Sequence, residues 1–352
     1  MTSGRAGANL AAIASELGVS AATVSNALSG KGRVSAELSE KIRAKAHELG
    51  YVPGIAGRAL RTGRSGVLGL VLPDIANPLF PQIAQAIEKA ADDAGYGVLI
   101  ADSHGDVAKQ TQAINRLIER GVEGMVVVPR RGTRIGNVDC PVAVIDSPST
   151  PGNTVSADHW DGGFQVGRHL AALGHDRVVI IGKNRDSNVQ NDRIGGIRSG
   201  LGSAAVTEIM WITSLEKHAG AGCPLGVTEK VAEGFTAFAA VSDLHALRVL
   251  TELQRNGVTV PEQASVTGFD DLIWAPVVTP ALTTVRMDMA RVADIAITAL
   301  VRSIETEDRP ISGGVIADIS KVAMELIIRG SSGPNHKKQA ENKTSTAGEL
   351  TS

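Results

Sequence analysis

From residue 65 to residue 330 the chain alternates short apolar runs with amphipathic helical stretches, and this pattern restricts the fold more than any other feature of the sequence. Stretches such as 79–94 and 111–120 carry apolar residues at helical spacing. The apolar runs are nearly continuous, as strands covered on both faces are. They read "VLGLVLPDI", "GVLIADS", "GMVVVP", "PVAVID", "RVVIIG", "FAAVSD" and "ASVTGFDD". The alternation predicts an α/β fold with doubly wound parallel sheets, and about 265 residues of it make two lobes.

A separate small unit precedes this region. The stretch "NLAAIASELGVSAATVSNALSG" predicts two short helices, because Gly18 suits the left-handed residue that ends the first and Ser20 can cap the second. Ala14, Gly18 and Val24 lie at the offsets where a helix-turn-helix needs a small residue, a turn glycine and a packed apolar side chain. A third helix over about residues 36–49 would close this all-α core.

The second helix of this unit carries the side chains that we expect to meet DNA. Helix-turn-helix proteins place this helix in the major groove, where its outward residues contact base edges. The candidate DNA-binding residues here are Ser20, Ala21, Ala22, Thr23, Ser25 and Asn26. A helical hairpin that docks a protein partner would have a similar pattern, and it stands as the alternative at this stage.

Charge is distributed unevenly along the chain. Residues 1–65 contain nine Lys and Arg against four Glu, a net charge of +5, so the remainder carries −7 of the total of −2. A basic module on an acidic body is typical of proteins that bind a polyanion such as DNA, although a solvated basic face would look similar. Arg33, just after the second helix, is a candidate phosphate contact.

Several other classes of protein find no support in the sequence. No run of about 18 apolar residues could span a bilayer, and the first residues lack the apolar core of a secretory signal, so we expect a cytoplasmic protein without membrane contact. Cys140 and Cys223 are far apart and without nearby His, which predicts ordinary thiols and no metal site. No P-loop, dinucleotide fingerprint or catalytic triad motif occurs, so we expect neither a cofactor nor an enzyme.

Two further stretches carry a resemblance to a known family. "VSAATVS" and "ELGYVPGIAGRALRTGRSGVLGLVLPDIANPLF" are similar to the recognition helix, the G-Y-x-P motif and the R-x-L hinge of the LacI/GalR family of bacterial transcriptional regulators, and the likeness runs from about residue 9 to residue 330. The resemblance implies that a hinge at 53–64 forms a helix on DNA, with Leu60 wedged into the minor groove and Arg61 beside it. Gly57 departs from the family, which more often has Ala, and should raise the cost of ordering the hinge by about 0.5–1 kcal/mol per chain.

The resemblance also implies a domain organisation. A helix-turn-helix domain (1–52) and the hinge (53–64) precede a periplasmic-binding-protein-like (type I) effector domain (65–330), in which the chain crosses between two lobes near Asp158, Val285 and Asp318. Lobe 1 would comprise about 65–157 and 286–317, and lobe 2 about 158–285 and 318–330. The polar tail, 331–352, lacks apolar heptads and is predicted to be disordered, so a coiled-coil tetramer is not expected.

Polar residues at strand ends are the candidates for effector binding, because the carboxyl ends of parallel strands line the ligand crevice. The resemblance implies effector contact for Asp146, Arg193 and Asp270. Aromatic rings can stack on the apolar face of a sugar. The full set of candidates is Phe80, Asp146, Arg193, Ser242, Asp270 and Trp274. Each has a structural alternative: a carboxylate can cap the next helix, Arg193 can form a structural ion pair, and the aromatics can belong to the core.

These features together predict a transcriptional regulator, most simply a repressor that binds a palindromic operator in double-stranded DNA as a homodimer. A small-molecule effector between the lobes would control it. A sugar or sugar derivative is favoured over a purine, because few aromatic residues are present to sandwich a base. The alternatives are a solute-binding protein of a sugar transporter, which shares the two-lobed fold, and an activator with the same architecture.

Overall fold

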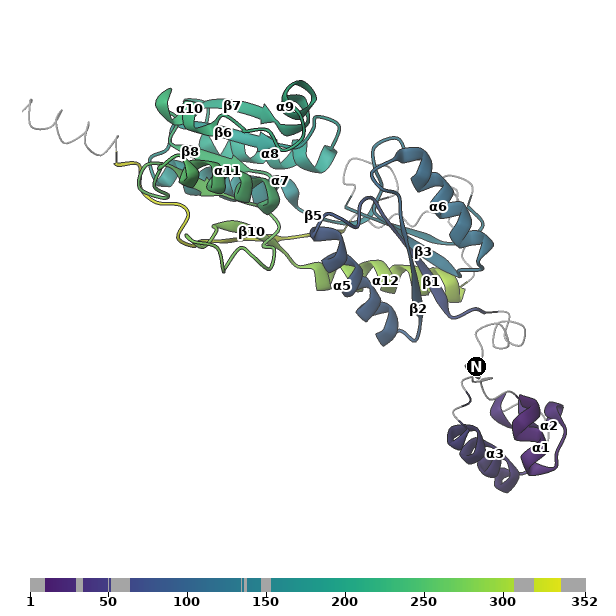
Figure 1. Cartoon of the computed structure of the whole chain (residues 1–352). Helices are drawn as coiled ribbons and strands as arrows, with labels where there is room; N and C mark the ends of the chain where they lie inside the picture. The colour runs from purple at the N-terminus through teal and green to yellow at the C-terminus, as the bar shows by residue number, and fades with distance from the viewer. Residues whose placement is uncertain are drawn as a thin grey trace, which may run out of the picture. The chain divides into compact units, whose positions relative to one another are not determined.

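The computed structural model, drawn in Figure 1, describes most of the chain. The described residues are 10–29, 34–49, 51, 64–133, 135, 138–146, 153–306 and 320–336. The chain divides into two compact units, Met1–Ser65 and Gly66–Ser352. Within the described ranges, no helix is long and apolar enough to cross a membrane.

The first unit contains three short helices: α1 (Leu10–Leu17), α2 (Ala21–Ser29) and α3 (Ala36–Glu48). Each contributes one fully buried apolar side chain to a common core, namely Ile13, Val24 and Ile42. Gly18 has a φ of 65°, which only glycine adopts at little cost, and so ends α1. The Ser20 hydroxyl caps α2 by accepting a hydrogen bond from the backbone N–H three residues on, at 3.0 Å. The predicted helix-turn-helix is therefore confirmed as a fold.

Lobe 1 of the second unit has a six-stranded parallel sheet with the strand order β11-β5-β4-β3-β1-β2. Its strands are β1 (Val67–Leu72), β2 (Gly97–Asp102), β3 (Gly124–Val127), β4 (Val142–Ile145), β5 (Asn153–Ala157) and β11 (Ser320–Val322). Its helices are α5 (Leu79–Asp93), α6 (Val107–Glu119) and α12 (Met289–Thr306).

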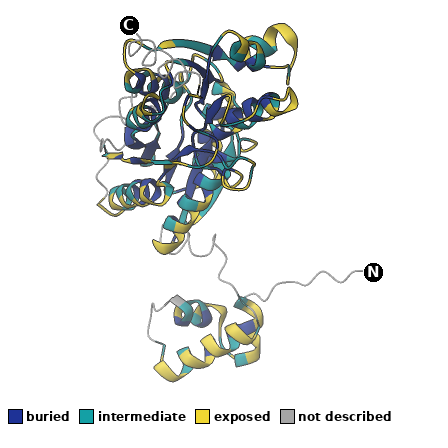
Figure 2. Cartoon of the chain, turned by 90° about the vertical axis from the view of Figure 1, so that its left-hand side faces the viewer, coloured by how far each residue is buried: buried dark blue, intermediate teal, exposed yellow. Residues whose placement is uncertain are grey.

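Helices cover both faces of this sheet. Leu68, Leu70 and Leu72 of β1 pack in one apolar cluster with α5 and α12, whereas Val71 packs in another cluster with Ile114 of α6. In Figure 1, α6 accordingly lies across the sheet from α5 and α12. Alternate residues of each strand therefore face different helices, which is why the strands read as continuous apolar runs. Figure 2 shows the buried residues concentrated along the strands.

Lobe 2 has a four-stranded parallel sheet with the order β7-β6-β8-β9. Its strands are β6 (Arg177–Gly182), β7 (Val206–Trp211), β8 (Ala237–Ala240) and β9 (Ser265–Thr267). Its helices are α7 (His159–Ala172), α8 (Asn188–Leu201), α9 (Ile212–Ala219), α10 (Val227–Ala232) and α11 (Asp243–Arg255). Val178 and Ile180 of β6 pack with α7 and α8, and Val179 and Ile181 pack with α9 and α11. The prediction of a doubly wound α/β fold is confirmed in both lobes.

A two-stranded antiparallel ribbon of β10 (Thr284–Met287) and β12 (Met324–Ile327) joins the lobes. The third passage of the chain between the lobes differs from the prediction, which placed it near Asp318 and assigned 318–330 to lobe 2. Ser320–Val322 instead forms β11 and pairs in parallel with β5 in lobe 1, so the chain leaves lobe 1 only after Val322. The three-residue strand "SKV" is too short and too polar to be found from its sequence.

The C-terminal segment also departs from the prediction, because the packed structure continues past residue 330. Ser331 is fully buried, and its hydroxyl donates a hydrogen bond of 2.6 Å to the Val266 carbonyl in lobe 2. The imidazole of His175, whose pKa burial lowers, lies 3.0 Å from the Gly333 carbonyl. Residues 331–336 therefore belong to the effector domain, and the rest of the predicted tail, 337–352, lies outside the described residues.

Helices α7 and α8 pack with their backbones nearly in contact. A Cβ atom added at Gly163, Gly167, Gly196 or Gly200 would lie 2.0–2.3 Å from a carbonyl oxygen of the facing helix. Only glycine permits so close an approach. The contact brings the start of α7 close to the middle of α8, where the residues of the candidate effector site lie.

Candidate functional site

The exposed face of α2 carries the candidate DNA-binding residues. Ala21, Ala22 and Asn26 are exposed, and Ser25 is half-buried. Ser20 is exposed, but its hydroxyl is engaged in capping α2 and lies 2.9 Å from the Thr23 hydroxyl. This helix therefore presents small and neutral side chains, which allow its backbone to approach a base edge closely.

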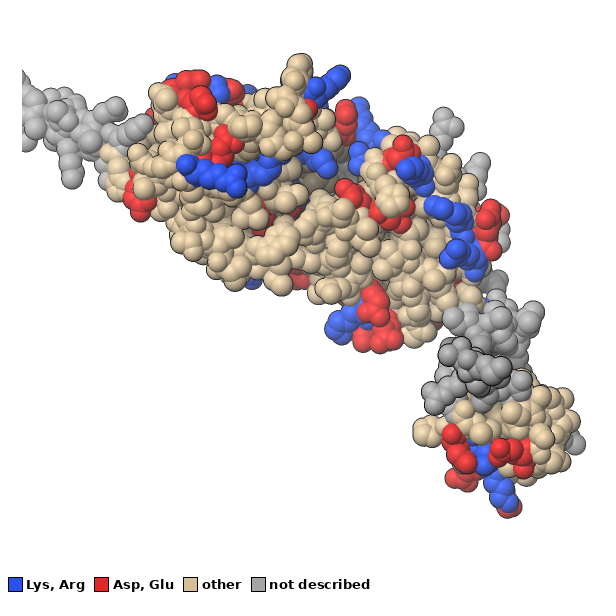
Figure 3. Space-filling model, in the orientation of Figure 1, with Lys and Arg blue, Asp and Glu red and all other residues tan. Residues whose placement is uncertain are grey.

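The positive charge of the first unit is not carried by its described helices (Figure 3). Lys41 pairs with Glu37 at 2.8 Å, and Lys45 lies within 3.0 Å of both Glu16 and Glu48. Of the nine basic residues counted in 1–65, five are outside the described residues: Arg5, Lys31, Arg33, Arg58 and Arg61. The excess of positive charge thus belongs to the segments that flank α1, α2 and α3.

The predicted hinge contacts and one phosphate contact also lie outside the described residues. They are Arg33, Leu60 and Arg61. Their roles remain predictions from the family resemblance and from charge.

In the second unit, a buried chain of polar contacts connects lobe 1 with lobe 2. The Asp146 carboxylate at the end of β4 lies 2.7 Å from Nε2 of His159, the first residue of α7. Arg193 of α8 donates from Nε to His159 Nδ1 at 3.3 Å and from Nη1 to the Val241 carbonyl at 2.7 Å. Arg193 Nη1 also lies 2.9 Å from Oδ1 of Asp270, which follows β9. The structure therefore brings Asp146, Arg193 and Asp270 together, as the strand-end argument predicts for Asp146 and Asp270.

The two carboxylates of this chain have unusual backbones and opposite pKa shifts. Asp146 has a φ of 59° and Asp270 a φ of 104°, conformations that cost energy outside glycine and concentrate at functional sites. Burial acts to raise the pKa of Asp146, but its interactions with His159 and Arg193 outweigh burial and hold that pKa below its usual value. For Asp270 burial dominates and raises the pKa despite the nearby guanidinium. The partner of Asp270 Oδ1 is the Arg193 guanidinium, whose Nη1 lies 2.9 Å away.

Asp243, at the start of α11, adds a third buried carboxylate. Its Oδ1 accepts a hydrogen bond of 2.6 Å from the Thr284 hydroxyl, and its Oδ2 accepts one of 2.7 Å from the Leu272 amide. Burial, followed by the charge of Asp270, raises the pKa of Asp243 to about 7. Asp243 therefore fixes the loop after β9 and serves a structural purpose.

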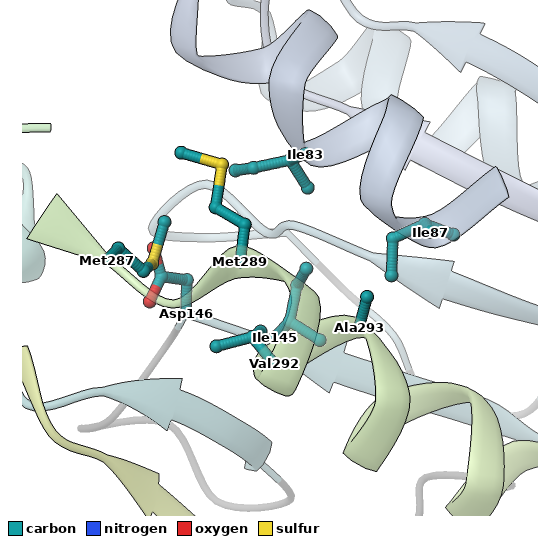
Figure 4. A pocket seen from close by; sticks show the side chains of 8 residues that line it. All are labelled: Ile83, Ile87, Ile145, Asp146, Met287, Met289, Val292 and Ala293. Atoms are coloured by element: carbon teal, nitrogen blue, oxygen red, sulfur yellow. The ribbon is translucent and has the colours of Figure 1, made fainter. Parts of the chain in front are cut away.

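An apolar pocket in lobe 1 opens beside Asp146 (Figure 4). Its walls come from α5, from the end of β4, and from β10 with the start of α12. Asp146 is its one charged residue, and the others are aliphatic or thioether side chains. The lining residues are Ile83, Ile87, Ile145, Asp146, Met287, Met289, Val292 and Ala293. In this structure the pocket has room for no more than about one water molecule, so a larger ligand would require its walls to move apart.

The other predicted effector residues lie outside this chain of contacts. Phe80 is half-buried and packs against the apolar core. The Ser242 hydroxyl accepts a hydrogen bond from the His245 amide at 3.4 Å and so caps α11. Trp274 has 39% of its surface exposed in the loop after β9. None of the three lines the pocket of Figure 4.

Two further residues of this region, His159 and Trp211, were not among the predicted site residues. His159 begins a helix, so the strand-end argument passes over it. Trp211 ends β7, an edge strand of mixed polarity whose sequence, "VTEIMW", carries no continuous apolar run, so the strand-end argument does not reach it either. Its ring packs so closely on Gly182 that a Cβ there would lie 2.7 Å from it, and the Arg185 guanidinium lies 5.8 Å from the ring centre. Within the described residues, no group of three His, Cys, Asp or Glu side chains could hold a metal ion.

Comparisons with known proteins agree with this architecture. Residues 9–54 match the family described as bacterial regulatory proteins, lacI family, and residues 168–332 match the periplasmic binding protein-like domain. The HTH-type transcriptional regulator DegA of Bacillus subtilis is 29% identical over 286 residues, which cover 78% of this chain and 84% of DegA. The HTH-type transcriptional regulator MalR of Streptomyces coelicolor is 29% identical over 340 residues, 92% of this chain and 96% of MalR.

Solved structures share the whole fold. The lac repressor dimer bound to operator and the anti-inducer ONPF superposes with a TM-score of 0.77 at 23% identity, covering 93% of this chain and 99% of that one. The regulator CelR in complex with cellobiose has a TM-score of 0.65 at 22% identity and covers 92% and 100% of the two chains. At such identities the likeness concerns the fold. Together with the two matched domains and the curated relatives, it makes this chain a member of the LacI/GalR family of bacterial transcriptional regulators.

Proposed function

We propose that the protein is a repressor that binds a palindromic operator as a homodimer and is controlled by a sugar or sugar derivative between its lobes. One observation carries this proposal: a helix-turn-helix unit shares a chain with a two-lobed domain whose lobes are linked by a buried polar chain. A solute-binding protein would have no use for the first unit, so the regulator is favoured over that alternative. The same reasoning favours a location in the cytoplasm, where the DNA is, and a non-catalytic role.

Recognition of DNA would divide between two kinds of residue. Asn26, exposed on α2, can make paired hydrogen bonds to a base edge, whereas Arg33 can contribute charge at the phosphates. The excess of positive charge in the flanking segments is consistent with this division.

The DNA proposal can be tested with an operator selected from a random duplex library. Asn26→Ala should remove about 1–3 kcal/mol of sequence discrimination, and Ala44→Ser, at an exposed neutral position of α3, should remove none. Arg33→Ala should weaken binding to all sequences alike and reduce the slope of log affinity against log salt by about 1. Equal losses for Asn26→Ala and Ala44→Ser would contradict the assignment of α2 as the reading helix.

An exposed apolar patch on lobe 2 supports the proposed homodimer. Ile273 and Val277 are 71% and 72% exposed, and Leu244, at the start of the adjoining α11, is 39% exposed. Clustered apolar residues at a surface mark contact sites more often than single ones do. Val277→Asp should yield monomers in sedimentation velocity, whereas Ile328→Asp, at an equally apolar position that is 62% exposed, should leave the dimer intact. A dimer unaffected by Val277→Asp would place the interface elsewhere.

The buried polar chain offers the kinds of contact that a sugar uses. Its carboxylates, Asp146 and Asp270, come from different lobes, and the residues beside Asp146 in lobe 1 are apolar. Carboxylates accept hydroxyl hydrogens, and apolar walls cover the C–H face of a sugar ring.

Effector binding is tested by thermal melting against a panel of sugars, sugar phosphates and nucleobases. A ligand at 100 times its dissociation constant adds about 2.7 kcal/mol of stability, which is readily detected. Asp270→Asn should abolish the selective shift while operator binding is kept. Leu60→Ala should do the opposite, weakening operator binding much more than ligand binding. The absence of any shift across the panel would argue against a sugar effector.

A further inference from the structure

His159 is buried at the point where the chain first enters lobe 2, and both nitrogens of its ring have partners. Nε2 lies 2.7 Å from the Asp146 carboxylate of lobe 1. Nδ1 lies 3.3 Å from Nε of Arg193 in lobe 2. The side chain has no exposed surface, so water cannot replace either partner.

The identity of these partners determines where the imidazole carries its proton. An arginine Nε–H can only donate, so Nδ1 of His159 must accept. The ring hydrogen then resides on Nε2 and is donated to Asp146, whose carboxylate can only accept when ionised. The His159 tautomer is thus set by one residue from each lobe.

The same bond orients the Arg193 guanidinium. Three constraints act on this group besides His159: the Val241 carbonyl at 2.7 Å, Asp270 at 2.9 Å, and the Phe269 ring, whose centre lies 3.9 Å from Cζ. The Val241 carbonyl and Asp270 fix the position of Nη1, and the Phe269 ring fixes the plane of the guanidinium. Among the described residues, His159 is therefore the one that fixes Nε. Without this acceptor a buried donor would have no partner, and the guanidinium would turn to find one.

We infer that His159 is the positioning residue of the buried polar chain: through its Nε2–H tautomer it aligns Arg193 of lobe 2 with Asp146 of lobe 1. A ligand that engages Asp146 then alters the bond to His159, and through it the orientation of Arg193. The part of this inference that concerns ligands rests on the proposed function, whereas the hydrogen-bond geometry does not.

Three variants separate the two bonds of the ring. In His159→Asn the new side-chain oxygen can reach the position of Nδ1, so this variant keeps an acceptor for Arg193 and loses the donor to Asp146. His159→Gln reaches the position of Nε2 and keeps the opposite bond. His159→Phe keeps an aromatic ring and removes both bonds. If His159 only filled space, Phe would be its best replacement. The inference predicts instead that His159→Phe is the most disruptive of the three variants.

The first measurement is nuclear magnetic resonance of the full-length protein without ligand. In protein labelled with ¹⁵N-histidine, His159 should show a protonated Nε2 and an unprotonated Nδ1. The side-chain Nε–H signal of Arg193, identified by its loss in Arg193→Lys, should persist in His159→Asn and disappear in His159→Gln and His159→Phe. A wild-type His159 protonated at Nδ1, or an Arg193 signal unchanged in His159→Phe, would overturn the inference. Because the tautomer is measured on the wild-type protein, this measurement tests the inference even if a variant fails to fold.

The second measurement uses thermal shift with D-ribose, cellobiose and glucose 6-phosphate as probes. A probe that stabilises the wild type should bind His159→Phe about tenfold more weakly or worse, with a smaller loss for His159→Asn. His218→Asn, at an exposed position of α9, is the control and should bind as the wild type does. Equal binding by wild type and His159→Phe would refute the role of His159 in ligand binding. If no probe shifts the wild type, the proposed sugar effector loses support while the resonance result still decides the positioning role.

Discussion

Adjacent glycines in α8 allow a strict test of the contact between α7 and α8. A Cβ at Gly196 would lie 2.0 Å from the Trp160 carbonyl oxygen and 2.8 Å from the Phe164 amide, both of them backbone atoms of α7. A Cβ at Gly195 would lie 3.7 Å from the Trp160 ring, an ordinary van der Waals distance. Both glycines are helical, so the change of helix propensity on substitution by Ala is the same at the two positions.

The expected effects have opposite signs. Gly195→Ala should stabilise the protein by about 0.5–1 kcal/mol, because Ala loses less conformational freedom than Gly when it enters a helix. Gly196→Ala gains the same amount, but the helices must separate by about 1 Å to accept the methyl group, and overpacking of this kind costs about 1–3 kcal/mol or more. A backbone carbonyl cannot rotate away as a side chain can, so the upper part of that range is expected. The two variants should differ by about 2–3 kcal/mol.

The assay is urea unfolding of the full-length variants, followed by circular dichroism. Unfolding of a chain this long can pass through intermediates, so thermal midpoints serve as a second readout, with about 2–4 °C expected per kcal/mol. The same displacement would separate His159 from Arg193, so Gly196→Ala should also lose the Arg193 Nε–H signal that Gly195→Ala retains. Equal stability of the two variants would refute the close packing of α7 and α8.

Three other predictions follow from single contacts. Folding raises the pKa of Asp243 from an ordinary value near 3.8 to about 7, so the ionised carboxylate is disfavoured in the folded protein. The wild type should therefore lose stability relative to Asp243→Asn as the pH rises from about 4 to about 7. A stability difference between the two proteins that does not change with pH would refute this. A chain ending at Gly330 should melt well below one ending at His336, because it lacks the buried Ser331 hydrogen bonds. Ser35→Ala should cost about 1 kcal/mol of stability in the first unit, measured by its own unfolding transition, because the Ser35 hydroxyl caps α3.

Local chemistry made the first unit predictable. Its helix ends are set by a turn glycine and two serine caps, Gly18, Ser20 and Ser35, which act within four residues of themselves. The strands buried on both faces were found for a similar reason, because continuous burial leaves a continuous apolar run.

Strands that depend on tertiary pairing were not predictable. β5 reads "NTVSA" and is buried throughout, and the hydroxyl oxygen of its Thr154 accepts a hydrogen bond of 3.0 Å from the Val144 amide of β4. β7 is an edge strand of mixed polarity, and β11 has three residues. Their pairing comes from neighbours distant in the sequence, so no local pattern records it.

The residues of the candidate site also differ in whether a local sequence pattern could indicate them. Asp146 and Asp270 follow apolar strands, and parallel topology brings such ends to one edge, so the sequence could indicate them. His159 could not be indicated in this way, because its position follows from the close packing of α7 on α8. Phe80 and Trp274 were chosen for their chemistry alone, without a topological argument, and neither lies in the pocket or in the polar chain.

The charge balance of the buried cluster limits the chemistry of an effector. Asp146 and Asp270 both interact with the Arg193 guanidinium, and Asp243 lies close enough to Asp270 for their charges to interact. Burial raises the pKa values of Asp243 and Asp270, and the charge of Asp270 raises that of Asp243 further, so additional negative charge is unfavourable there. An anionic group directed into this cluster would add to that repulsion, whereas a neutral hydroxyl group could donate a hydrogen bond to a carboxylate oxygen without adding charge.

The cluster therefore favours a neutral ligand rich in hydroxyls over a phosphorylated one. The proposed sugar effector fits this condition, because the hydroxyl groups of a sugar donate hydrogen bonds and carry no charge.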